Sequence, residues 1–390
     1  MKKFAKVALA AACMSFAAVS HAAEPFKIGL ILPMTGPFAS TGKQVSAAAK
    51  LYMQQHGDEV AGRKVELIIK DDGGTQPEVT KRLAQELVVQ DHVNVLAGFG
   101  LTPLAFSTAP IATQAKVPMV VMAAGTSSIV QKSPFIVRTS MTLPQVTAPI
   151  AKWAATNPKA NIKTAVTLVS DYGPGHDSEK VFIKTFTENG GKVLESMRIP
   201  MQNPDFSPFL QRVRDIKPDA VFVFVPSGQG STVMKQFVER NLKAQGVKLI
   251  GTGDILDDDL LPNMGDETLG IITSQHYSAA HDSPENKAFV DAFKKANDGM
   301  RPNFMAVGGY DGMHLIYAAL KKAGAKANGQ QLLDAMKGMA WMSPRGPMMI
   351  DPETRDVIQN VYIREAKRLD DGQIYNVEFD VMKDVKDPGT

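Results

Sequence analysis

Val93–Pro103, with the sequence VNVLAGFGLTP, decides the fold. Its apolar first part predicts a short strand that is buried on both faces. Gly98 and Gly100 then allow a tight turn in which main-chain N–H groups can point outward. Thr102 and Pro103 are suited to capping and starting a helix. Open α/β sheets bind ligands where a strand, a glycine turn and a helix meet, so this stretch predicts half of a ligand site.

The same alternation of strand and helix continues on both sides of this stretch. We expect strands at 26–32, 65–69, 117–122, 165–169, 192–198, 220–225, 249–250 and 271–273, and helices near 40–55, 77–88, 146–155, 178–188, 206–214, 233–242, 284–293 and 303–320. The pattern pauses around 135–144, and residues after 348 alternate like an antiparallel ribbon. The chain therefore predicts two α/β units in series, each with a doubly wound parallel sheet.

The first residues have the features of an export signal. Three lysines precede a mostly apolar stretch at 7–19, and Ser20-His21-Ala22 fits a small-x-small cleavage site. We expect residues 1–22 to be removed by cleavage after Ala22, with cleavage after Ala23 as the alternative. The mature protein is expected to reach the periplasm. A lipoprotein site ending at Cys13 is a weaker alternative, because the apolar run before it is short. No later stretch is long and apolar enough for a transmembrane helix.

Removing this signal changes the charge and the cysteine content. The chain has 43 Lys and Arg against 40 Asp and Glu, and three of the lysines lie in the signal, so the mature protein is near neutral. Nucleic acid, which needs a basic face, is not an expected partner. Cys13 is the single cysteine of the chain. The mature protein therefore has no disulfide, thiolate nucleophile or cysteine metal site.

Four loops at the ends of predicted strands are rich in Gly, Ala, Ser and Thr: 98–102, 123–128, 226–231 and 251–254. Such loops offer N–H groups and hydroxyls to a carboxylate or another small polar group. Turns of α/β folds need small residues in any case, so only the four loops together favour a site. Asp254 adds a carboxylate at a strand end beside two glycines.

Other kinds of site fit the sequence poorly. The segment 36–43 has the wrong spacing for a phosphate loop, and the glycines at 98 and 100 lack the third glycine of a dinucleotide fingerprint. The seven histidines have no zinc spacing, and Asp257–Asp259 lack a calcium-loop pattern, so we interpret these aspartates as a solvated helix start. No cofactor or metal is expected.

Two stretches, His176-Asp177-Ser178 and His281-Asp282-Ser283, contain the residue types of a hydrolase triad. Triads are defined by geometry and not by adjacency, and no nucleophile elbow is present. We interpret both serines as helix caps. The protein is not expected to be an enzyme, and an exported hydrolase is the alternative.

The chain resembles the leucine/isoleucine/valine-binding family of type I periplasmic binding proteins, which deliver solutes to ABC importers. The stretches that carry the resemblance are 28–42, Asp71-Asp72, Val117–Thr126 and Asp171–Gly175. The family fold implies two lobes joined by a three-stranded hinge. It implies lobe one at 24–140 plus 278–356, and lobe two at 141–277 plus 357–390.

The resemblance also implies which residues bind the ligand. Lobe one would hold a carboxylate, and lobe two would hold the rest of the ligand, with Asp254 for an amino group; the implied ligand-binding residues are Thr102, Ala123, Ala124, Thr126, Tyr172, Ser227 and Asp254. Two aromatic positions of the branched-chain amino acid binders are missing, near Thr41 and at Pro226-Ser227. Aromatic side chains dominate contact area, so the pocket shape should differ.

The sequence therefore predicts a monomeric, periplasmic solute-binding component of an ABC importer with a membrane permease as partner. The expected ligand is an amino acid or a similar small carboxylate, which selects the closed state of the two lobes. Aromatic carboxylates or amides are the alternative ligands. A ligand sensor with the same fold is an alternative role.

Overall fold

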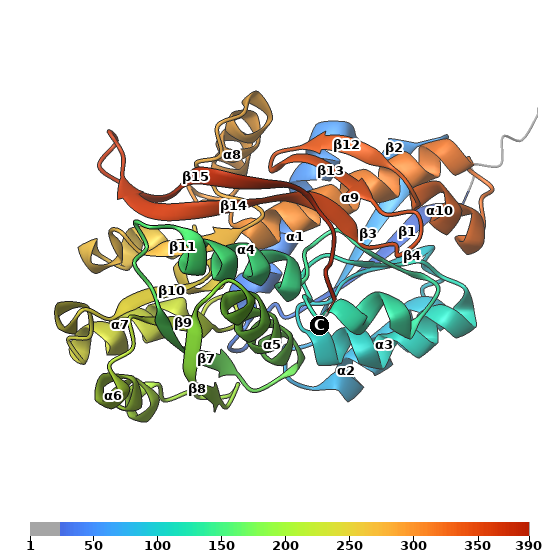
Figure 1. Ribbon diagram of the computed structural model, residues 1–390. Coiled ribbons are helices and arrows are strands. Elements are labelled where there is room, and N and C mark those ends of the chain that lie inside the picture. The colour runs from blue at the N-terminus through green and yellow to red at the C-terminus, as the bar shows by residue number, and fades with distance from the viewer. Residues whose placement is uncertain (1–23, 390) are drawn as a thin grey trace, which may run out of the picture.

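Two β-sheets organise residues 24–389, which are the residues that this computed structural model describes. Each sheet, with its helices, forms one α/β lobe, and Figure 1 shows the lobes side by side. The predicted signal peptide lies outside the described residues. Within residues 24–389, no helix has the length and apolar character needed to cross a bilayer.

The first sheet has the strand order β2 (Glu59–Val60), β3 (Arg63–Asp71), β1 (Phe26–Leu32), β4 (Val95–Gly98), β5 (Met119–Val121) and β6 (Ile136–Arg138). All pairs are parallel except β2 with β3. Helices α1 (Ala39–His56), α2 (Pro77–Val89) and α3 (Thr102–Ala115) connect the strands. β4 and β5 are fully buried, as their continuous apolar runs require in a covered parallel sheet.

The second sheet contains a parallel part and an antiparallel part. The parallel part has the order β8 (Lys192–Ile199), β7 (Thr164–Ser170), β9 (Ala220–Phe224), β10 (Lys248–Thr252) and β11 (Ile272–Gln275). β14 (Val357–Arg368) pairs antiparallel with β11, β13 (Gly346–Ile350) and β15 (Ile374–Val385), and β12 (Ala340–Ser343) pairs with β13. Helices α4 (Leu143–Thr156), α5 (Gly173–Glu188), α6 (Ser207–Ile216) and α7 (Gly230–Glu239) belong to this lobe.

Three further helices, α8 (Pro284–Ala296), α9 (Phe304–Ala323) and α10 (Gly329–Met336), return the chain to the first lobe, where α8 and α9 pack on α1. The chain then re-enters the second sheet through the β12–β15 strands, shown in orange and red in Figure 1. The predicted lobe boundaries stay a prediction. β12 and β13 fall within the range expected for lobe one but are hydrogen bonded into the second sheet.

Several local expectations change in the structure. α5 begins at Gly173, so Ser178 lies inside the helix and is not its cap; its hydroxyl is 2.8 Å from the Thr147 hydroxyl. The second cap is confirmed, because Ser283 accepts a hydrogen bond from the Asn286 N–H at the start of α8. The elements β2, β6, β12 and α10 were not predicted, because they are short or lack a clear apolar period.

Candidate ligand site

The candidate site lies where the strand order reverses in both sheets. In the first sheet β1 lies between β3 and β4, and in the second sheet β7 lies between β8 and β9. Loops on either side of such a point leave a crevice at the carboxyl ends of the strands. The loops after β4 and β5 in the first lobe, and after β7, β9 and β10 in the second, carry all of the predicted ligand-binding residues.

These loops enclose one cavity between the lobes. It is lined by Thr41, Gly100, Leu101, Thr102, Ala123, Ala124, Gly125, Met141, Leu143, Tyr172, Pro174, Phe224, Pro226, Ser227, Asp254 and Met305. The volume that the centre of a water molecule can occupy in this cavity is about 20 Å³, which is room for about one water. Six of the seven predicted residues line it, and the seventh, Thr126, has its hydroxyl oxygen 2.9 Å from that of Thr102.

The polar residues of the first-lobe wall are Thr41 and Thr102, and Thr126 is paired with Thr102 outside the lining. The Thr102 and Thr126 Oγ1 atoms are 2.9 Å apart, and both residues are buried. Ala124 contributes less than the resemblance implies, because its N–H already donates to the Phe99 carbonyl at 3.0 Å. The Ala124 N–H is therefore not free for a ligand.

The starts of two helices meet at these threonines. Thr102 is the first residue of α3, and Gly173 is the first residue of α5. A Cβ atom on Gly173 would lie 2.8 Å from the Thr126 Oγ1, so the absence of a side chain lets the second lobe approach this closely. First-turn N–H groups lack helical partners and favour negative charge, so both helix ends suit a bound carboxylate.

The second-lobe wall combines aromatic rings with one serine. The Tyr172 and Phe224 rings stack with centroids 6.1 Å apart and an interplanar angle of 18°. The Ser227 hydroxyl donates to the Asp257 Oδ2 at 2.9 Å, and the Gly228 N–H donates to the same oxygen at 2.7 Å. Ser227 therefore lines the cavity with its hydroxyl proton already engaged.

Asp254 supplies the carboxylate of this wall. It is 2% exposed, accepts a hydrogen bond from the Thr252 hydroxyl at 2.8 Å, and lies 3.5 Å from the Gln275 Nε2. Burial raises the pKa of Asp254 to about 6, while the Thr252 hydroxyl and the charge of Arg364 oppose this rise. Burial and the Asp254 carboxylate raise the pKa of Tyr172 well above its ordinary value.

The interpretation of Asp257–Asp259 as a solvated helix start is wrong. Asp257 and Asp258 are buried, and the segment follows a short 3₁₀ helix at 253–256. Asp259 joins the lobes, because it accepts hydrogen bonds from Ser40 at 3.0 Å and from Asn303 at 2.9 Å. Burial, with the charges of Asp259 and Asp254, raises the pKa of Asp257 well above its usual range.

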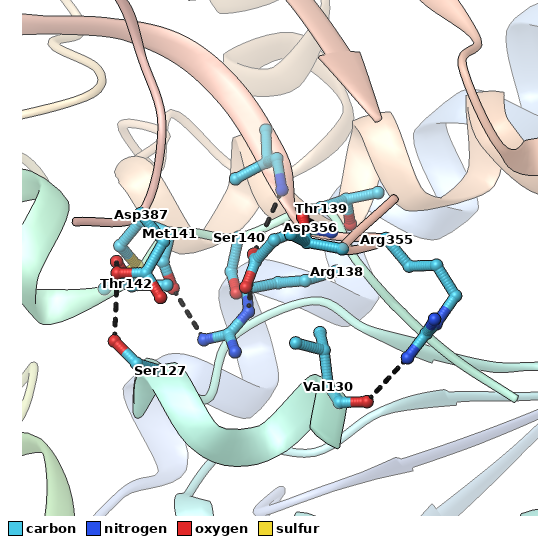
Figure 2. A network of polar contacts seen from close by, with 12 residues as sticks. Ser127, Val130, Arg138, Thr139, Ser140, Met141, Thr142, Arg355, Asp356 and Asp387 are labelled. Carbon is cyan, nitrogen blue, oxygen red and sulfur yellow. Dashed lines mark hydrogen bonds and ion pairs between the residues drawn. The ribbon is translucent and has the colours of Figure 1, made fainter. Parts of the chain in front are cut away.

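Arg138 is a positioning residue that the sequence reasoning missed. It is fully buried at the end of β6 and donates to the carbonyls of Ala124 (3.2 Å), Thr126 (2.8 Å) and Met141 (3.1 Å). Figure 2 shows its guanidinium beside Asp356, with an Nε to Oδ1 distance of 3.0 Å. Arg138 thus holds the loop that carries the predicted carboxylate ligands. The sequence signal that could have identified Arg138 is that it is the single charged residue in the apolar run 135–138.

The two triad-like stretches lie away from the cavity lining. The His176 Nε2 is 2.7 Å from the Asp171 Oδ1, and the His281 Nδ1 is 2.7 Å from the Glu378 Oε2. Ser178 is paired with Thr147, and Ser283 is a helix cap. Within residues 24–389, no group of three or more His, Asp or Glu side chains is placed to hold a metal ion.

Two α/β lobes with a cavity between their switch-point loops define a solute-binding protein. The chain belongs to the periplasmic binding protein family, whose family model matches residues 25–373. The resemblance to leucine/isoleucine/valine-binding proteins is confirmed. A Leu/Ile/Val-binding protein homolog 6 of Brucella melitensis is 45% identical over 391 residues, covering 100% of this chain and 99% of that protein.

Two similar solved structures are solute-binding proteins of ABC transporters. One, from Rhodopseudomonas palustris BisB5, is in complex with 3,4-dihydroxybenzoic acid; it is 59% identical, covers 93% of this chain and 99% of that chain, and has a TM-score of 0.91. The other, from R. palustris HaA2, is in complex with p-hydroxybenzoic acid. It is 43% identical, the match covers 93% of this chain and 98% of that chain, and the TM-score is 0.89.

Proposed function

We propose that this protein is the periplasmic solute-binding component of an ABC importer and that its ligand is a hydroxylated aromatic carboxylate. The observation that carries the ligand class is the likeness to a solute-binding protein in complex with 3,4-dihydroxybenzoic acid, at 59% identity over almost the whole length. A likeness of this extent supports a shared ligand class, and the cavity has the groups that such a ligand needs.

The ligand would lie across the cavity from one lobe to the other. Its carboxylate would accept hydrogen bonds from Thr102 and Thr126, close to the starts of α3 at Thr102 and α5 at Gly173, where negative charge is favoured. Its ring would pack against the stacked Tyr172 and Phe224. A ring hydroxyl would donate to Asp254, which lines the opposite wall.

An amino acid is the second candidate, and one observation favours it. Asp254 is a buried carboxylate in the cavity wall and could accept an ammonium group. A small α-amino acid carries its carboxylate and its ammonium group on the same carbon atom, whereas the threonines and Asp254 belong to different lobes. The aromatic carboxylate, with polar groups at opposite ends of a ring, suits this separation better.

The transport role follows from the family and the expected export signal. The mature protein would bind its ligand as a monomer in the periplasm, close its lobes, and dock on a membrane permease. A sensor for a membrane receptor is the alternative role. Uptake of a labelled ligand by cells that lack this protein or the permease would separate the two roles.

Thermal shift and titration calorimetry on the mature protein test the ligand class. The protein should be unfolded and refolded first, so that any co-purified ligand is removed. Para-hydroxybenzoate and 3,4-dihydroxybenzoate should raise the melting temperature, because a ligand that binds only the folded state stabilises it. Leucine and phenylalanine are the comparison ligands. Stabilisation by these amino acids alone would overturn the proposal.

A further inference from the structure

We infer that Asp387 holds the two lobes in the closed state through Ser127, and that it thereby sets how long the ligand stays bound. Asp387 lies in the segment 386–389, which follows β15, and Ser127 directly follows the predicted ligand residue Thr126. Asp387 does not line the cavity, so it is a positioning residue for the ligand loop, 123–128. This inference rests on the proposed function and assigns the residence time of the ligand to a contact outside the cavity.

Ser127 is held by two carboxylates that belong to the other lobe. It is buried and begins the 3₁₀ helix 127–132, between β5 and β6 of the first sheet. Its N–H donates to the Asp177 Oδ2 at 3.1 Å, and its hydroxyl donates to the Asp387 Oδ1 at 2.9 Å. Asp177 lies on α5, and Asp387 follows β15 of the second sheet. Both hydrogen bonds therefore join the lobes directly beside Thr126.

Contacts within the second lobe already fix Asp387. The Thr142 hydroxyl donates to the same Oδ1 atom at 2.8 Å, and Figure 2 shows this carboxylate beside the Thr142 and Ser127 hydroxyls. Thr142 is the N-cap of α4 and accepts from the Gln145 N–H, which orients its hydroxyl. The Gln145 amide also donates to the Val385 carbonyl at 2.9 Å. Because the carboxylate is in place beforehand, binding Ser127 costs little conformational entropy.

The contact with Ser127 lies where the lobes meet at the ligand site. The Thr126 Oγ1 is 2.9 Å from the Thr102 Oγ1, and a Cβ atom on Gly173 of α5 would lie 2.8 Å from the same Thr126 atom. The start of α5 can therefore separate from this threonine only if the hydrogen bonds of Ser127 to the second lobe are also lost.

Loss of these hydrogen bonds is a step in ligand release. The cavity has room for about one water, so a bound ring can leave only after the lobes separate. A hydrogen bond that exists only in the closed state shifts the equilibrium between open and closed lobes toward the closed state. Asp387 would thus slow dissociation of every ligand by the same factor, since it touches none of them.

The test follows the distance between the lobes with two fluorescent dyes. The mature protein would contain no cysteine, because Cys13 lies in the predicted signal, so two cysteines can be introduced for labelling. Glu78→Cys on α2 and Glu239→Cys on α7 are exposed and belong to different lobes. Energy transfer between the dyes reports closure. Excess unlabelled wild-type protein traps released ligand, so the decay of the signal gives the dissociation rate.

Ser127→Ala is the main variant, because it removes the hydrogen bond between the lobes and leaves Asp387 bound to Thr142. The dissociation rate of para-hydroxybenzoate should rise about fivefold or more, since hydrogen bonds to charged groups are strong. The association rate should stay the same or rise. Benzoate should dissociate faster by the same factor. An unchanged dissociation rate, or a factor that differs between the two ligands, would overturn the inference.

The aspartate side of the contact has a matched control. Asp387→Ala should also speed dissociation, and the double variant with Ser127→Ala should release ligand no faster than Asp387→Ala alone, because both remove one contact. Asp380→Ala changes the same residue type at an exposed position on β15 and should leave the rate unchanged. Additive effects of the two changes, or an equal effect of Asp380→Ala, would contradict the inference.

Failure of the proposed function would have a different signature. In that case neither benzoate nor para-hydroxybenzoate would bind the wild-type protein. The unliganded protein would then decide the inference, because its lobes should be more open in Ser127→Ala than in the wild type, with lower energy transfer. Equal energy transfer in the two proteins would overturn it.

Discussion

Arg138 and Asp356 form a buried ion pair that joins the two sheets beside the candidate site. The Arg138 Nε lies 3.0 Å from the Asp356 Oδ1, and both side chains are at most 4% exposed. Arg138 ends β6 of the first sheet, and Asp356 immediately precedes β14 of the second. The same guanidinium holds the carbonyls of the ligand loop, so fold stability and site geometry depend on one contact.

Replacing Arg138 should therefore affect stability strongly. Arg138→Met leaves the Asp356 carboxylate buried without its cation, and we expect a loss of about 3–5 kcal/mol in the free energy of unfolding. Urea denaturation measures this change. Arg214→Gln, at an exposed position on α6, should have almost no effect. A double variant with Asp356→Leu should recover much of the loss, and no recovery would mean that the carbonyl contacts dominate.

Thr102 should contribute to ligand affinity through its hydroxyl. Thr102→Val keeps the shape of the side chain but removes a hydrogen bond to a carboxylate, which is worth about 1.5–3 kcal/mol. Para-hydroxybenzoate and benzoate should lose affinity to the same extent, because both have the carboxylate. Calorimetry tests this, with Thr102→Ser as the control that retains binding. Equal affinities of Thr102→Val and wild type would place the carboxylate elsewhere.

Gly253→Ala should reduce stability, because Gly253 lies against the Arg364 side chain. Its new methyl group would meet the Arg364 guanidinium, and overpacking of this kind costs about 1–3 kcal/mol. Gly246→Ala provides the comparison, because its φ of +86° predicts a stability loss in open space away from the site. Urea denaturation measures both losses, and a Gly253→Ala variant as stable as the wild type would contradict this packing argument.

Stability should rise as the pH falls from neutral to mildly acidic values. Burial raises the pKa values of Asp254, Asp258 and Asp356 to about 6, above the ordinary value of 3.8. The folded state therefore takes up protons before the unfolded state does, and unfolding becomes less favourable as the pH falls through about 6 toward 4. Below that range, carboxylates with lowered pKa values, such as Asp351, lose their stabilising contacts.

Urea denaturation between pH 7.5 and 4.5 measures this dependence. Asp254→Asn should reduce the slope of stability against pH, by up to about 1.4 kcal/mol per pH unit where only the folded state is protonated. Asp371→Asn is a suitable control, because hydrogen bonds lower the pKa of this exposed carboxyl. A wild-type stability that falls steadily from neutral pH to pH 5 would contradict the prediction.

The local elements of the fold could be predicted, whereas their distant partners could not. β4 and β9 were evident because their apolar runs are short and end in glycine-containing loops, and the loop positions of Thr102 and Ser227 followed from those strands. The resemblance then grouped them into one site. Arg138 and Asp356 are 218 positions apart, and neither has a local signal of pairing.

The same limit explains the error at Asp257–Asp259. Consecutive acids normally stay in water, and the sequence around them contains no cation. Their burial depends on Arg301, Asn303, Arg364 and Asn376, which reach the segment from later parts of the chain. A local sequence pattern predicts the exposure of a segment by itself, and contacts with distant parts of the chain can bury a segment that is predicted to be exposed.

The small size of the cavity has a kinetic consequence. Room for about one water cannot admit an aromatic ring, so a ligand must wait until contacts between the lobes separate, among them Ser40 to Asp259 and the Ser127 N–H to Asp177 at 3.1 Å. The frequency of this opening would set an upper limit on the association rate, however concentrated the ligand is. The same contacts between the lobes would slow dissociation of the ligand, so the complex should persist long enough to meet a scarce membrane partner.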